Sequence, residues 1–167
     1  AQLAVQRSDP RGEELTRHCV AVKPDHFAAH VLLAQQLYDR DRFEEGLEHC
    51  RLAIAILDRI AATPPDRELN VVERGWLQSA LIWTVEHADR LTATGPAKDA
   101  MVRLERFVTD GDLDDRRLLD YTIALGTTTT PGIWSPARAL QLADLARSRY
   151  LAHGEEIPLP YREPLVA

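Results

Sequence analysis

Apolar residues at steps of three and four positions run through residues 42–61 and constrain the fold more than any other feature of the chain. The stripe consists of Phe43, Gly46, Cys50, Ala53 and Leu57. On a helix with about 3.6 residues per turn, this spacing places all of these residues on one face. The pattern therefore predicts an amphipathic helix whose apolar face must be covered by a second element.

The segment before this helix supplies that second element. Residues 26–39 place His30, Leu33, Ala34 and Leu37 on one side. The turn at residues 40–42 is so short that the two helices must lie antiparallel, and the small residues Ala34 and Gly46 favour a close approach. Such a hairpin leaves a second apolar face uncovered, so we expect further hairpins to stack beside it.

Proline and glycine breaks divide the rest of the chain into further helices. Asp9-Pro10, Gly95-Pro96 and Ser135-Pro136 each place a proline after a residue that suits a helix cap, and Asp41-x-x-Glu44 resembles a capping box. No stretch shows the sustained alternation of a strand. The predicted helices span residues 10–22, 26–39, 42–61, 67–93, 97–108, 114–125 and 136–152. The helix at 67–93 is apolar nearly all round, so we expect it to be central.

The hairpin at residues 26–61 resembles a tetratricopeptide repeat. The first-helix pattern of that family falls on His30, Leu33, Ala34 and Leu37, and its second-helix pattern falls on Gly46, Cys50 and Ala53. The second-helix pattern recurs at Leu15-x3-Cys19, Ala100-x3-Leu104 and Ala139-x3-Ala143, and "EELTRHC" at 13–19 returns as "EEGLEHC" at 44–50. The chain departs from the family at His30 and Cys50, where the family has aromatic residues, and in its unequal repeat intervals.

The resemblance implies an all-α fold, a right-handed α-solenoid of about seven helices arranged as antiparallel hairpins. It implies a single domain at residues 1–157, followed by an irregular tail at 158–167. It also implies that a protein or peptide segment binds to the face lined by the first helices. Carried onto this chain, that face comprises Val31, Gln35, Tyr38, Asp39, Ile82, Val85 and Asp89. It holds no lysine or arginine to pair with a peptide carboxylate, and the acidic balance of the chain favours a neutral to basic partner.

Two other functions compete with peptide binding. His26 and His30 lie one helical turn apart, so with His49 they define an alternative small-molecule or metal site. Trp76 and Trp83, two turns apart, define an alternative structural role in self-assembly, with oligomers formed through their helix. A zinc site at His18-Cys19 and His49-Cys50 is disfavoured because adjacent helical residues point about 100° apart. The acidic run at 110–115 lacks the glycine and glutamate of a calcium loop and suits a helix start better.

Composition narrows the remaining possibilities. A net charge of −6 disfavours binding to nucleic acid, and no stretch is apolar enough for a membrane segment. Two cysteines and no leader sequence favour the cytoplasm. No phosphate loop, serine elbow, paired carboxylates or activated cysteine indicates an enzyme, and no cofactor is expected. Only two of the 20 lysine and arginine residues are lysines, which we attribute to a GC-rich genome. The expectation is an adaptor, or a non-catalytic domain of a larger bacterial protein.

Overall fold

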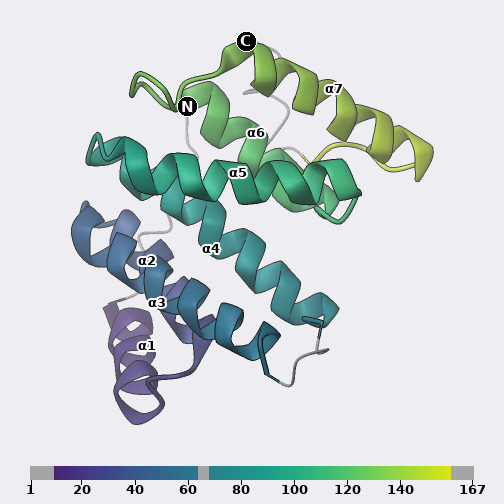
Figure 1. Cartoon of the computed structure of the whole chain (residues 1–167). Helices are drawn as coiled ribbons and strands as arrows, with labels where there is room; N and C mark the ends of the chain where they lie inside the picture. Colours follow the sequence, from purple (N-terminus) through teal and green to yellow (C-terminus); the bar gives the residue numbers. More distant parts are fainter. Residues whose placement is uncertain (1–9, 64–67, 159–167) are drawn as a thin grey trace.

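The computed structural model describes residues 10–63 and 68–158. In these ranges the chain forms seven helices and no strand, which confirms the all-α prediction (Figure 1). The helices are α1 (Pro10–Val22), α2 (Phe27–Tyr38), α3 (Phe43–Ala61), α4 (Val71–Arg90), α5 (Thr94–Asp110), α6 (Asp115–Thr127) and α7 (Pro136–Ala152). The expected tail lies outside the described residues except for Pro158. No helix in the described ranges combines the length and apolar character needed to cross a bilayer.

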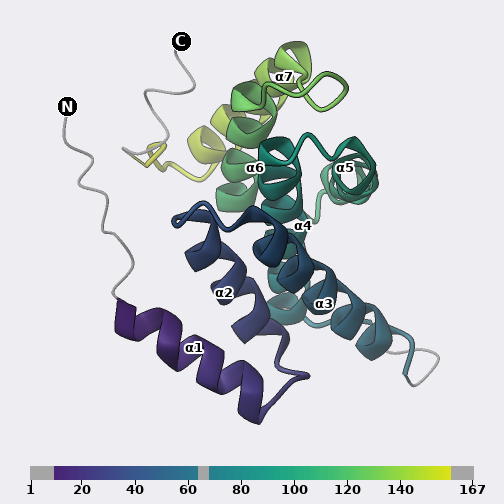
Figure 2. The same cartoon turned by 90° about the vertical axis from the view of Figure 1, so that its left-hand side faces the viewer.

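The helices contact one another in a regular order. Each helix from α1 to α4 lies against the next one in the chain, and α6 lies against α7. In addition, α2 contacts α4, and α4 contacts α6. Both views show the helices stacked from α1 at the bottom to α7 at the top (Figures 1 and 2). Helix α4 therefore lies between α2 and α6 in the stack.

Helix α4 is the centre of this arrangement, as its apolar sequence predicted. It contacts α2, α3, α5 and α6, and its Leu77, Leu81 and Val85 belong to a continuous core. That core extends from Leu57 on α3 to Tyr150 on α7. Because α4 is covered on several sides, most of its side chains serve packing, and few remain to face solvent.

The bounds of α4 differ from the prediction, which started the helix at 67 and ended it at 93. Asn70 caps α4, because its side chain accepts the Glu73 N–H at 2.9 Å while Glu73 accepts the Asn70 N–H at 3.0 Å. At the other end Thr92 has a positive φ of 52°, which ends the helix and turns the chain into α5. The predicted capping box at Asp41 is wrong, since Asp41 has a φ of 57° and the residue that precedes α3 is Arg42, without a side-chain cap.

Gly46 and Ala34 do permit a close approach, but to α4. The imidazole of His87 lies directly over Gly46, where a Cβ atom would be 2.7 Å from Nδ1 and closer still to Cε1 and Nε2. His87 Nε2 donates to the Ala34 carbonyl at 3.1 Å. One buried histidine thus joins both helices of the first hairpin to the central helix.

The loop after α6 is held by a side chain of α4. Asp89 Oδ1 accepts the backbone N–H groups of Thr129 and Thr130 at 3.0 and 2.9 Å, and the Thr130 hydroxyl donates to the Asp89 carbonyl at 3.0 Å. Ile133 of the same loop is fully buried. These contacts fix the segment between α6 and α7 against the C-terminal end of α4.

Candidate functional site

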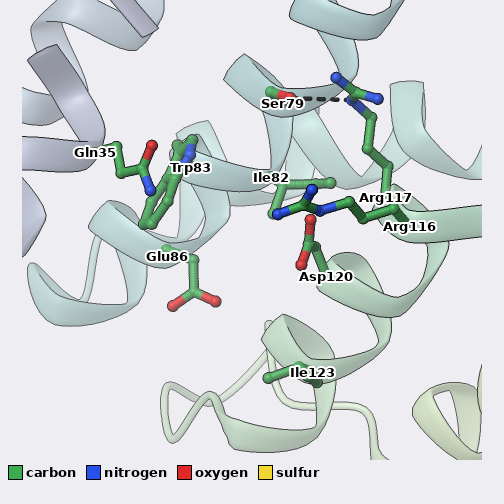
Figure 3. Close-up of a pocket in the computed structure, with 9 residues that line it drawn as sticks. All are labelled: Gln35, Ser79, Ile82, Trp83, Glu86, Arg116, Arg117, Asp120 and Ile123. Atoms are coloured by element: carbon green, nitrogen blue, oxygen red, sulfur yellow. Dashed lines mark hydrogen bonds between the residues drawn. The ribbon is translucent and has the colours of Figure 1, made fainter. Parts of the chain in front are cut away.

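A pocket of about 470 Å³ lies where α2, α4 and α6 meet (Figure 3). It is lined by Gln35 from α2, by Ser79, Ile82, Trp83 and Glu86 from α4, and by Arg116, Arg117, Asp120 and Ile123 from α6. A second hollow, of about 620 Å³, is lined by α4, by the segment that joins α5 to α6 and by Arg149 of α7, and two further hollows in the described surface are lined by one helix each, α1 or α5. The α2/α4/α6 pocket differs from the second hollow in its lining, because Ile82, Trp83 and Ile123 give it an apolar wall.

Apolar side chains form part of the pocket wall. Ile82 is almost fully buried, at 6% exposure, and Trp83 and Ile123 are partly buried. The Trp83 ring is held by Tyr38, with ring centroids 5.4 Å apart. A flat aromatic surface fixed in this way offers a rigid contact for an apolar or cationic group.

The α6 side of the pocket carries two arginines that already have partners. Arg117 Nε donates to the Ser79 hydroxyl at 3.0 Å, and its guanidinium forms an ion pair with Asp114. Figure 3 shows the guanidinium of Arg116 extending over Ile82 toward the carboxylate of Asp120. The positive charge on this side is therefore balanced locally.

Glu86, on the α4 side, is in a different situation. Its Oε2 accepts the Tyr38 hydroxyl at 3.1 Å, and that hydroxyl in turn accepts Arg90 Nε at 3.1 Å. Among the described residues Glu86 takes part in no ion pair. Burial raises the pKa of the Glu86 carboxyl. The hydrogen bond from Tyr38 and the charge of Arg90 oppose this, while the charges of Asp89 and Asp120 raise the pKa further. The ionised carboxylate thus sits where a cation would be favourable.

Arg90 lies against the aromatic rings of Tyr38 and Phe43, which are next to the pocket. Its guanidinium carbon lies 5.6 Å from the Tyr38 ring centroid and 5.9 Å from that of Phe43. His87 contacts the same rings, with centroids 5.3 Å from Tyr38 and 6.1 Å from Phe43. The aromatic cluster next to the pocket is therefore filled by the protein's own groups.

The predicted binding residues divide into three groups. Gln35 is exposed and lines the pocket, and the nearly buried Ile82 forms part of its wall. Tyr38 lies next to the pocket and donates a hydrogen bond to Glu86, which lines it. Asp39 is exposed at the C-terminal end of α2 but does not line the pocket. Val31 and Val85, at 2% and 0% exposure, belong to the core, because α2 and α4 are covered on both sides. A partner cannot reach these two side chains without unpacking the helices.

Two further expectations about this face need correction. Asp89 uses its carboxylate to bind the loop at Thr129 and Thr130, so its main contacts are internal. The face was expected to lack lysine and arginine, but α6 contributes Arg116 and Arg117. The contribution of α6 was missed, although Arg116, Asp120 and Ile123 follow the spacing of a helix face.

The histidines proposed as an alternative metal site are occupied by the protein itself. His26 Nδ1 accepts the Ala29 N–H at 3.2 Å and caps α2. His30 Nε2 lies 2.9 Å from the Pro24 carbonyl, which can only accept, so Nε2 carries the proton and Nδ1 accepts from His49 Nδ1 at 2.9 Å. In the described ranges no three histidine, cysteine, aspartate or glutamate residues are grouped to hold a metal ion. The arrangement therefore does not support the metal alternative.

The cysteine and tryptophan positions also have packing explanations. Cys50 is fully buried, and burial raises the pKa of its thiol to about 12, so it stays protonated. Trp76 and Trp83 are partly buried against the cluster of Val31, Ala53 and Ala80. The exposed tryptophan is Trp134 in the loop after α6, at 57% exposure.

Comparison with known proteins adds no further constraint on the site. No protein-family model matches this sequence, and no curated protein or solved structure shows significant similarity to it.

Proposed function

We propose that the chain is a tetratricopeptide-like module that binds an extended peptide segment of a partner protein in the α2/α4/α6 pocket. In this proposal the helices form a right-handed solenoid, in which α2, α4 and α6 are the first helices of successive hairpins. The contacts of α2 with α4 and of α4 with α6 support it, because first helices of stacked hairpins are neighbours. The module acts without catalysis, as an adaptor or as a domain of a larger cytoplasmic protein.

The observation that carries the proposal is the composition of a pocket shared by three helices. Its volume of about 470 Å³ lies in the usual range for binding sites, which is roughly 300–1,000 Å³. Trp83, Ile82 and Ile123 provide an apolar surface, and the polar side chains of Gln35, Ser79 and Asp120 surround it. Burial of one leucine-sized side chain there would contribute about 1.5–3 kcal/mol, and polar groups would set the register.

Selection from a random dodecapeptide library displayed on phage tests this function. Gln35 is exposed at the pocket, so Gln35→Trp should fill the entrance without burying a polar group. Leu32, on the same helix and 42% exposed, does not line the pocket, so Leu32→Trp is the matched control. We expect an enriched peptide family that binds wild type and Leu32→Trp but loses at least about tenfold in affinity for Gln35→Trp, the equivalent of 1.4 kcal/mol. Absence of any enriched family, or equal binding to Gln35→Trp, would refute the proposal.

A further inference from the structure

We infer that the end of the pocket formed by Glu86, Trp83 and Gln35 is a subsite for a lysine or arginine side chain of the bound peptide. This inference rests on the proposed function. Figure 3 shows these three side chains grouped at one end of the pocket, apart from Arg116 and Arg117 at the other. The two ends therefore differ in chemistry, and a peptide can bind in only one register.

The charged side chains of the pocket are unevenly paired. Arg117 is paired with Asp114, and Figure 3 shows the carboxylate of Asp120 next to the guanidinium of Arg116, so each arginine of the pocket has an acidic side chain nearby. Glu86 has no ion pair among the described residues. Arg90 is the nearby positive charge, and the Tyr38 hydroxyl lies between it and Glu86, because this hydroxyl accepts from Arg90 and donates to Glu86. One negative charge is thus left for a ligand to neutralise.

The groups around the Glu86 carboxylate suit an organic cation. A carboxylate accepts charge-assisted hydrogen bonds from an ammonium or guanidinium group, and the Gln35 carbonyl can accept another. The indole face of Trp83 attracts the same cation. No metal-binding group of three ligands occurs in the described residues, so one carboxylate beside an aromatic ring points to an organic cation.

An apolar wall leads to the Glu86 carboxylate. Lysine and arginine carry three or four methylene groups before the charge, and such stems pack along apolar surface while the charged head reaches a polar group. Ile82 and Trp83 provide that surface directly before Glu86 on the same helix. A lysine or arginine side chain can contact the apolar wall with its stem and the carboxylate with its charged head, whereas a small inorganic cation can contact only the carboxylate.

The test repeats the dodecapeptide selection with variants of Glu86. Sequences selected by wild type should share one lysine or arginine position, and Glu86→Gln, which keeps the shape and the acceptor for Tyr38, should lose that preference. For one selected peptide, replacing its basic residue by norleucine should weaken binding to wild type by about tenfold or more and should change binding to Glu86→Gln by less than about threefold. Glu48→Gln removes the same charge from α3, away from the pocket, and should behave as wild type.

The possible outcomes separate this inference from the proposed function. Peptides that depend on Gln35 but show no basic position would overturn the cation subsite and leave peptide binding in place. Selection of the same basic position by wild type and Glu86→Gln would also overturn it. No enriched family at all would overturn both. A circular dichroism melt of Glu86→Gln shows whether the variant is folded, so a misfolded protein cannot be taken for lost specificity.

Discussion

The contact between Gly46 and His87 makes a sharp prediction about stability. In Gly46→Ala, the new Cβ atom would lie less than 3 Å from three atoms of the imidazole, a separation that packed atoms do not tolerate. The ring cannot move aside freely, because its Nε2 is bonded to the Ala34 carbonyl and it is fully buried among Tyr38, Phe43 and Trp83. Either α3 must move away from α4, or His87 must lose its hydrogen bond.

Three contributions set the expected change in the free energy of unfolding of Gly46→Ala. Overpacking costs about 1–3 kcal/mol, and leaving the Ala34 carbonyl and the imidazole unpaired costs about 1–3 kcal/mol more if the bond breaks. Alanine offsets up to about 1 kcal/mol because it is a better helix former than glycine. We therefore expect Gly46→Ala to lower the free energy of unfolding by roughly 2–3 kcal/mol, which corresponds to a fall in Tm of roughly 5–10 °C for a domain of this size.

Urea denaturation followed by circular dichroism measures this free energy. The same Gly46→Ala change should be neutral or slightly stabilising in a His87→Ala background, where the ring is gone. The double-mutant cycle should therefore give a coupling of at least about 2 kcal/mol. A Gly46→Ala variant within about 0.5 kcal/mol of wild type, or one with an equal cost in both backgrounds, would show that His87 does not pack on α3 as described.

Three further predictions concern single side chains. Burial lowers the pKa of His87 to about 4, so the unfolded state binds a proton at a higher pH than the folded state does. The stabilisation should be fully present above about pH 6.5, and the free energy of unfolding should fall by up to about 3 kcal/mol as the pH drops toward 4. Urea titrations across this pH range measure the fall, which should be smaller in His87→Gln. Because the pKa of Glu86 is raised in the folded state, ionisation of this carboxyl destabilises the fold, and Glu86→Gln should have a higher Tm than wild type at pH 7. Below pH 4.5 the carboxyl is protonated in the folded and the unfolded state, so the two proteins should have the same Tm. An unchanged Tm of the variant at pH 7 would contradict the burial of Glu86. Asp89→Ala should lower the free energy of unfolding by about 1–2 kcal/mol and speed amide hydrogen exchange at Thr129 and Thr130, because both N–H groups lose their acceptor. Asp89→Asn keeps Oδ1 and should lower the free energy of unfolding less. Equal exchange in wild type and both variants would show that Asp89 does not hold this loop.

Helix content was predictable because its signals are local. Pro10 and Pro136 begin α1 and α7 at the predicted residues, since proline suits the first turn wherever the helix packs. The capping pattern Asn70-x-x-Glu73 also marks the start of α4 in the sequence, but the predicted helix was started at residue 67, before this pattern. In contrast, the similar pattern at Asp41 failed because the tight turn after α2 needs a left-handed residue there.

The pocket was less predictable because it depends on how helices pack. Val31 was placed on an outer face because it lies opposite the stripe of His30 and Leu33. However, α2 contacts α1, α3 and α4, so both of its sides are buried. The side of α6 that turns toward α4 is likewise decided by tertiary contacts, which is why Arg116 and Asp120 were not assigned to the site. Gln35 and Ile82, two of the residues expected on the binding face, both line the pocket because neighbouring helices leave that part of the face open.

NMR can show directly whether a peptide binds where α2, α4 and α6 meet. Chemical-shift changes would be recorded on isotopically labelled protein as a dodecapeptide selected by wild type is added. We expect the largest changes on the Trp83 indole N–H and on the amides of Gln35, Glu86 and Ile123. Changes concentrated on α1 or α5, with these four signals unmoved, would contradict binding at this pocket.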